Sequence, residues 1–206
     1  MLFKKWATTI ADKLAGMAGQ TDTYQIALIR YRLECLFSMI LNTLLLVIVG
    51  AVLGILKTAF LIALTGAVVK TVSGGLHLNT PLRCAIIGAL ITAGFSYLAI
   101  YLPAYTLSPY LLLGILLLMN VIIWWKAPRE SEGKPLSDQQ KKYLAIISRI
   151  LVFALSVCCF LWPKRWGVNE LFYGLVFQTL SLLNFSARLM ANIDVALAHI
   201  EKKPVL

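Results

Sequence analysis

The sequence predicts an all-α, polytopic integral membrane protein with about six transmembrane helices and an N-terminal amphipathic helix. Of its 206 residues, 60% are hydrophobic and only 14% are charged. Soluble domains are about 45–50% apolar and about 25% charged, so this chain is too apolar to be one. The composition also excludes disordered and collagen-like chains, and its basic residues are too few to coat a nucleic-acid-binding surface. Four cysteines in a chain of this length do not make a disulfide scaffold.

Residues 1–20 predict an amphipathic helix that lies in the membrane interface. Apolar side chains recur there at helical spacing with charged side chains between them, and no continuous apolar stretch or cleavage site of a secretory signal follows. The apolar set is Leu2, Phe3, Trp6, Ile10, Leu14 and Met17.

Six apolar segments follow, and a helix needs roughly 20 apolar residues to cross the hydrocarbon of a bilayer. The segments are residues 35–56, 58–69, 84–102, 107–125, 143–162 and 171–190. The second segment is short, so it either spans where the bilayer is thinned or re-enters from the side on which it began.

We expect the whole chain, residues 1–206, to form one membrane-embedded domain. Its parts are the interfacial helix (1–20), the transmembrane bundle (35–190) and a cytoplasmic tail (191–206). The one long polar stretch, residues 126–142, is a connection within that domain.

The distribution of Lys and Arg predicts the orientation. In a six-span arrangement fifteen of these residues lie on the side of the two termini and three lie on the opposite side. The fifteen are Lys4, Lys5, Lys13, Arg30, Arg32, Lys70, Arg83, Lys126, Arg129, Lys134, Lys141, Lys142, Arg188, Lys202 and Lys203, and the three are Lys57, Lys164 and Arg165. Cytoplasmic loops carry the excess of Lys and Arg, so both termini are predicted to be cytoplasmic. Orientation therefore explains most of the net charge of +10 without an acidic ligand.

The segment 70–84 is the richest polar cluster near the membrane, and it contains one of only two histidines, His77, and Cys84. On an unbroken helix these two residues would be separated by about 10.5 Å along the axis, too far for contact. Gly74 and Gly75 favour a bend, however, and Pro81 suits the first turn of a new helix.

With Thr80 as N-cap, Cys84 falls at the end of the first turn of that helix. The positive end of the helix dipole and the neighbouring Arg83 favour a thiolate there. If the loop folds back, His77 comes within hydrogen-bond reach and completes an activated nucleophile. A packed cysteine and a solvated histidine are the structural alternative, and the spacing alone leaves both interpretations open.

Other polar residues have weaker assignments. Glu34 either pairs with Arg30 at i, i+4 or orients His77, a role also open to Ser73 and Asn79. Arg149 lies inside the fifth segment, where it either reaches the cytoplasmic surface or binds a substrate carboxylate. Neither an HExxH, a GxSxG nor a phosphate-binding loop motif is present, so we predict no metal and no cofactor.

The order Lys70, Gly74-Gly75, His77, Cys84 resembles the signature of the accessory gene regulator B (AgrB) proteins of Gram-positive bacteria. That signature is a basic residue, Gly-Gly-x-His, and a Cys seven residues after the His. The amphipathic N-terminus, residues 29–34 and residues 127–136 are similar as well. Lys70 is a departure, because many members carry Arg there, and bidentate recognition of a carboxylate would be lost.

The resemblance implies a cysteine endopeptidase in the cell membrane of a Gram-positive bacterium, with Cys84 as nucleophile and His77 as base and acid. It implies an AgrD-type precursor peptide as substrate, removal of its C-terminal tail, and closure of the remainder into a thiolactone or lactone quorum-sensing signal. Membrane lipid and a second copy of the chain, as a homodimer, are the other partners it suggests. The supporting or substrate-binding candidates are Lys70, Gly74, Gly75, Ser73, Asn79, Arg83, Glu34 and Arg149. A small membrane transporter or exporter, or a non-catalytic membrane scaffold, are the alternative functions.

Overall fold

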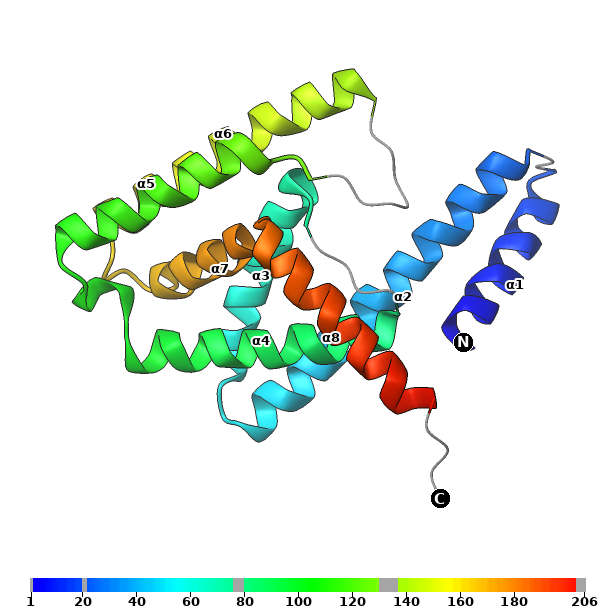
Figure 1. The fold of residues 1–206 in the computed structure, drawn as a ribbon, viewed down its shortest axis with the longest axis horizontal. Coiled ribbons are helices and arrows are strands. Elements are labelled where there is room, and N and C mark those ends of the chain that lie inside the picture. The colour runs from blue at the N-terminus through cyan, green and yellow to red at the C-terminus, as the bar shows by residue number, and fades with distance from the viewer. Residues whose placement is uncertain (1, 20–21, 76–79, 130–136, 203–206) are drawn as a thin grey trace.

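The computed structural model describes residues 2–19, 22–75, 80–129 and 137–202, and within these ranges the secondary structure is helical (Figure 1). This confirms the predicted all-α class. The helices are α1 (Leu2–Met17), α2 (Thr23–Val52), α3 (Leu56–Ser73), α4 (Pro81–Tyr101), the short 3-10 helix η1 (Ala104–Thr106), α5 (Pro109–Lys126), α6 (Asp138–Leu161), α7 (Val168–Ser181) and α8 (Asn184–Lys202).

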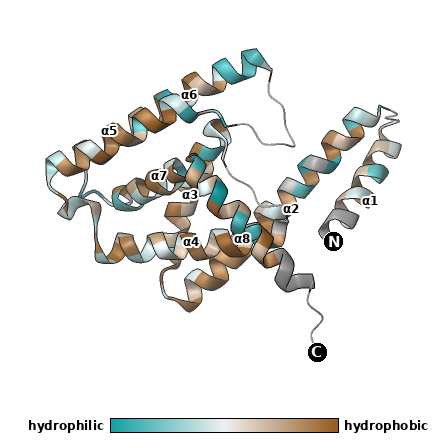
Figure 2. Ribbon diagram, in the orientation of Figure 1, coloured by the Kyte–Doolittle hydropathy of each residue, from teal (hydrophilic) through white to brown (hydrophobic). Residues whose placement is uncertain are grey.

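Five helices, α2 to α6, are long and apolar enough to cross a membrane, so the chain is a multi-pass membrane protein. Hydrophobic residues prevail along α4 and α5, whereas the first turns of α6 are hydrophilic (Figure 2). The segment predicted as short, residues 58–69, lies in α3, whose 18 residues give a helix of about 27 Å. That length is close to the roughly 30 Å of the hydrocarbon core.

The sixth predicted span, residues 171–190, is not one helix. It is divided between α7, with 14 residues, and α8, with 19 residues. Local hydrogen bonds satisfy carbonyl groups at the end of α7: Leu182 N–H donates to Thr179 O, and the Ser186 hydroxyl donates to Leu180 O at 2.6 Å. A helix of 14 residues is about 21 Å long, too short to cross a bilayer by itself. The expected boundary at residue 190 accordingly falls inside α8.

Helix α7 packs closely on α3 in the centre of the molecule. Gly174 permits this approach, because a Cβ atom at that position would lie 2.5 Å from Thr65 Cβ and 2.9 Å from Ile62 O. Ile62 and Leu175 are fully buried beside this crossing. The short α7 is therefore a core element and not a peripheral one.

The bundle has two distinct ends. At one end, which we call the glycine end, Gly74 after α3 pairs with Arg129 after α5, and Arg129 Nη1 donates to Leu182 O at 3.1 Å at the end of α7. At the opposite end, the Lys57 ammonium lies 4.9 Å from the centre of the Trp166 ring. The orientation prediction assigns Arg129 and Lys57 to opposite sides of the membrane, and the structure places them at opposite ends of the bundle.

Helix α1 lies along α2 (Figure 1). Ala7, Ala11 and Ala15, spaced by four residues, are buried in this contact, while Trp6 and Met17 are exposed. The structure thus confirms a helix over these residues, and Ile10 and Leu14 of the predicted apolar set are exposed on it as well. The place of this apolar face in the membrane interface stays a prediction.

Candidate active site

Cys84 lies in the first turn of α4, as predicted. Thr80 is the N-cap and its hydroxyl accepts from Arg83 N at 3.4 Å, Pro81 is the first helical residue, and Cys84 N donates to Thr80 O at 3.0 Å. Ser, Thr and Pro are favoured at these positions because they satisfy or lack the N–H groups that a helix start leaves unpaired. The cap therefore fixes the position of Cys84 relative to the membrane helix that follows.

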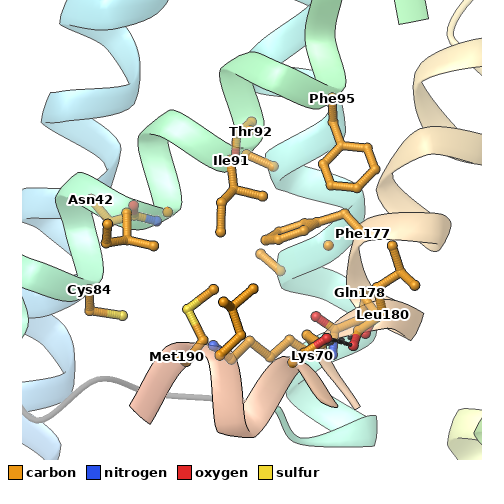
Figure 3. A pocket seen from close by; sticks show the side chains of 18 residues that line it. Asn42, Lys70, Cys84, Ile91, Thr92, Phe95, Phe177, Gln178, Leu180 and Met190 are labelled. Atoms are coloured by element: carbon orange, nitrogen blue, oxygen red, sulfur yellow. Dashed lines mark hydrogen bonds between the residues drawn. The ribbon is translucent and has the colours of Figure 1, made fainter. Parts of the chain in front are cut away.

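A cavity of about 330 Å³ lies beside Cys84. In Figure 3 the sulfur of Cys84 points into this cavity, with Phe95 and Phe177 on the far side and Met190 below. The lining residues come from α2, α3, α4, α7 and α8 and are Asn42, Ala63, Gly66, Ala67, Lys70, Cys84, Ile87, Gly88, Ile91, Thr92, Phe95, Phe177, Gln178, Leu180, Ser181, Ser186, Leu189 and Met190. Cys84 is half-buried, so its thiol is both sheltered and accessible from the cavity.

The Gly74-Gly75 bend follows α3 and is held by backbone contacts. Gly74 has φ +71°, and a Cβ atom there would lie 2.1 Å from Arg129 O. Arg129 N donates to Ser73 O at 2.9 Å in the same contact. Only glycine fits this position, because the backbone conformation and the close approach both exclude a side chain. The bend predicted from the two glycines is confirmed.

Gln178 of α7 is a site residue that the sequence reasoning missed. Its amide Nε2 donates to Gly74 O at 2.7 Å and to the Ser73 hydroxyl at 3.0 Å, and the side chain is 1% exposed. Gly75 packs beside it, with a would-be Cβ 3.3 Å from both Gln178 Nε2 and Lys70 Cε. The signal was present, since an amide inside an apolar segment is costly in lipid and calls for a partner. Asn42, on the cavity wall from α2, could have been found in the same way.

Arg83 does not face the cavity. Its Nη1 donates to a carboxylate oxygen of Asp194 in α8 at 2.9 Å, and both side chains are nearly buried. The expected role of Arg83 beside the thiol is thus replaced by a contact that joins the start of α4 to α8. Asp194 carried no recognisable signal in the sequence, because an acidic residue in an amphipathic helix is ordinarily solvated.

Three other predicted site residues, Ser73, Glu34 and Arg149, lie outside the cavity lining. Ser73 is buried and donates to Val69 O at 2.9 Å, so it belongs to the hydrogen bonds around Gly74. Glu34 is half-buried on α2. Its expected partner, Arg30, instead contacts Asp12 of α1 at 3.3 Å.

Arg149 of α6 contacts Trp124 at the cytoplasmic end predicted for α5. Its guanidinium carbon lies 4.1 Å from the centre of the Trp124 ring, and its Nη2 donates to Trp124 O at 3.1 Å. This contact matches the surface-directed alternative, and neither Arg149 nor another residue of α6 lines the cavity.

Of the predicted residues, the structure therefore brings Lys70 and Cys84 to one cavity, with Gly74 and Gly75 at its edge. The remaining two, His77 and Asn79, lie outside the described residues. In the part of the chain that is described, no group of three or more His, Cys, Asp or Glu side chains is close enough to hold a metal ion.

Comparison with known proteins gives consistent matches. The family model described as "Accessory gene regulator B" matches residues 4–182. The protein FsrB of Enterococcus faecalis (strain ATCC 47077 / OG1RF) is 27% identical over 163 residues, which are 78% of this chain and 66% of FsrB. A protein of Clostridium perfringens (strain 13 / Type A) that is named as AgrB-like is 20% identical over 200 residues, which are 90% of this chain and 93% of that protein. No solved structure matches the chain. Because the family model covers nearly the whole bundle, the chain belongs to the accessory gene regulator B (AgrB) family, which has a role in processing autoinducer peptide precursors in quorum sensing.

Proposed function

We propose that this chain is a membrane cysteine endopeptidase that removes the C-terminal tail of an AgrD-type precursor peptide and closes the remainder into a cyclic signal. The observation that carries the proposal is the position of Cys84, on the first turn of α4 with its sulfur directed into a sheltered cavity. Membership of the AgrB family supports the substrate class.

The other described cysteines lack such a position. Cys159 is buried in α6 and its thiol contacts Val168 O, and Cys158 beside it is half-buried in the same apolar helix. A small apolar role suffices for both. Cys84 is thus the cysteine whose surroundings can admit a peptide.

In the first step, the Cys84 thiol gives its proton to His77 and the thiolate attacks the carbonyl of the bond to be cleaved. His77 then gives that proton to the departing amine, the tail leaves, and the precursor remains bound to Cys84 as a thioester. In the second step, a thiol or hydroxyl inside the precursor gives its proton to His77 and attacks the thioester carbonyl. Cys84 leaves as a thiolate and takes that proton back from His77. The product is a thiolactone or a lactone.

This sequence of steps requires that water be kept from the thioester, because hydrolysis would release a linear peptide. A cavity bordered by five helices and lined mostly by apolar side chains supports that requirement. Holding the internal nucleophile close to the thioester makes the second step effectively unimolecular.

The arrangement of charges supports a cytoplasmic position for Cys84. The glycine end carries Lys70 and Arg129, whereas Lys57 and Arg165 lie toward the opposite end near Trp166. Helix α7 runs back from the end near Trp166 to the glycine end, where Leu182 contacts Arg129. With the glycine end in the cytoplasm, the end of α7 is therefore cytoplasmic, as is the start of α2. A maleimide that cannot cross membranes should then leave Cys84 unlabelled in intact cells, and labelling from outside would contradict this orientation.

Co-expression with a candidate precursor tests the function. Mass spectrometry should show trimmed and cyclised peptide with the wild-type chain, no trimming with Cys84→Ala or His77→Ala, and normal trimming with the matched control Cys158→Ala. Trimming that survives Cys84→Ala would refute the peptidase. Export of untrimmed precursor that is independent of both Cys84 and His77 would favour a transporter, and precursor binding alone would favour a scaffold.

A further inference from the structure

The geometry points to the cavity beside Cys84 as the binding site for one side chain of the precursor. That side chain belongs to the residue whose carbonyl Cys84 attacks, and the cavity accepts a large apolar one. This inference rests on the proposed function and adds the specificity of the cleaved bond. In the thioester, the acylating residue is joined directly to the sulfur. Its side chain must therefore lie within a few bonds of the space into which the sulfur points.

The walls of the cavity are suited to an apolar occupant. Ile87 and Ile91 line it from α4, the helix that carries Cys84. Phe95 and Phe177 contact each other on the far side from Cys84, with ring centres 5.6 Å apart. The amide of Gln178, at the polar margin, is already engaged with Ser73 and Gly74. An acidic side chain entering this space would lose its hydration to mostly apolar walls, whereas an apolar one gains by burial.

The room for this occupant comes from small residues on two helices. Ala63, Gly66 and Ala67 of α3 and Gly88 of α4 all line the cavity. The volume of about 330 Å³ lies at the lower end of the roughly 300–1,000 Å³ of ligand pockets. A cavity of that size suits one side chain with part of its backbone and not a whole peptide.

One wall comes from α8, which begins beyond residues 4–182, the part matched by the family model. Leu189 and Met190 supply its apolar surface, and the Arg83–Asp194 contact fastens this helix to the same helix start that carries Cys84. The preference for the cleaved residue is thus set partly by a helix outside the matched region.

The test varies the cavity and the precursor together. Precursors that carry Ala, Leu, Phe, Trp or Asp immediately before the cleaved bond are mixed and added to membranes that contain the full-length chain. Mass spectrometry then gives their relative trimming rates. The wild-type chain should favour Leu or Phe over Ala and Asp by about tenfold or more, since a methylene in an apolar pocket is worth about tenfold or more in specificity.

Two cavity variants should shift this preference in opposite directions. Met190→Ala enlarges the cavity and should raise the rate for Trp relative to Leu, and Ala67→Phe fills it and should raise the rate for Ala relative to Phe. The matched control is Met39→Ala, since Met39 is 61% exposed on α2 and does not line the cavity. Relative rates that stay the same in both variants while trimming continues would overturn the inference and leave the proposed function intact. A preference for Asp would overturn it as well.

A second measurement does not depend on precursor trimming. N-acetyl-phenylalanyl chloromethyl ketone and N-acetyl-aspartyl chloromethyl ketone alkylate thiols, and peptide mapping reports the labelling of Cys84. The phenylalanyl reagent should label Cys84 about tenfold faster than the aspartyl reagent, and Ala67→Phe should abolish this difference. Equal labelling by both reagents would overturn the apolar site, and selective labelling without any precursor trimming would retain the site while refuting the proposed function.

Discussion

The contact between Arg83 and Asp194 should hold α8 against the start of α4, and the change Asp194→Leu tests this. The side chains of the two residues are 10% and 7% exposed, and the Nη1–Oδ1 distance is 2.9 Å. Arg83 also donates to Asp194 O at 3.2 Å, so the pair joins both side chain and backbone. The leucine replaces the carboxylate with an apolar group of similar size and removes the Asp194 charge from the guanidinium.

The expected cost follows from burial. Removing one partner of a buried ion pair typically destabilises a protein by about 3–5 kcal/mol, because a charge is left uncompensated. If the free energy that docks α8 falls by about 3 kcal/mol, the population of undocked helix rises by about two orders of magnitude. The exposed pair Arg30–Asp12, whose side chains are 39% and 56% exposed, serves as the control. Loss of an exposed pair costs at most about 1 kcal/mol.

Limited proteolysis measures this population directly. Arg188 is exposed on α8, so trypsin can cut after it only when this part of the helix unfolds, and loss of docking favours that unfolding. The rate of cleavage after Arg188 should rise about a hundredfold in Asp194→Leu and stay close to that of the wild type in Asp12→Leu, because Asp12 contacts α2 and not α8. Equal rates in the two variants would refute the conclusion that this ion pair fastens α8.

Three further changes follow from contacts at the glycine end and in α6. Gly74→Ala should lower the thermal stability of the purified chain markedly, because the added Cβ meets backbone at 2.1 Å, whereas Gly114→Ala, with nothing within 4 Å, should be neutral in the same melting assay. Gln178→Leu should cost about 1–3 kcal/mol in the free energy of unfolding, because it leaves the Gly74 carbonyl and the Ser73 hydroxyl without this donor; a melting temperature equal to that of the wild type would contradict this. Arg149→Lys should retain precursor trimming within about twofold, and a loss comparable to that of a catalytic variant would return Arg149 to the substrate-binding set.

Much of the fold was predictable because local rules act at the decisive positions. Thr80 and Pro81 give a helix start by capping chemistry alone, and that start places Cys84 at the end of the first turn of α4. The paired glycines predicted the bend after α3 for the same kind of reason. Long apolar segments predicted membrane helices because the bilayer fixes their length.

The break between α7 and α8 could not be predicted in this way. The apolar run through Leu180, Leu182 and Leu183 continues across it, so hydropathy alone joins the two helices into one span. What divides them is tertiary, since Gln178 ties the end of α7 to Gly74 and Asp194 ties α8 to Arg83. Contacts between residues more than 100 positions apart leave no trace in local periodicity.

The candidate site shows the same division between local and long-range information. Cys84 and the glycines were found from spacing, but the cavity is assembled from five helices, and its walls at Phe177 and Met190 belong to elements distant in the sequence. Arg83 was placed beside the thiol because it precedes Cys84, and it turns away because α8 supplies a carboxylate. The direction of a side chain depends on which helix packs against it.

The central claim is that Cys84 forms a thioester with the precursor, and trapping that species tests it most directly. A precursor whose internal cysteine and serine residues are replaced by alanine can acylate Cys84 but cannot close the ring, so the acyl-enzyme should accumulate. Intact-mass analysis of the full-length chain at mildly acidic pH should show an increase equal to the mass of the tail-less precursor peptide minus one water, and peptide mapping should place it on Cys84. An adduct on another residue, or tail removal that persists in Cys84→Ala, would contradict the account.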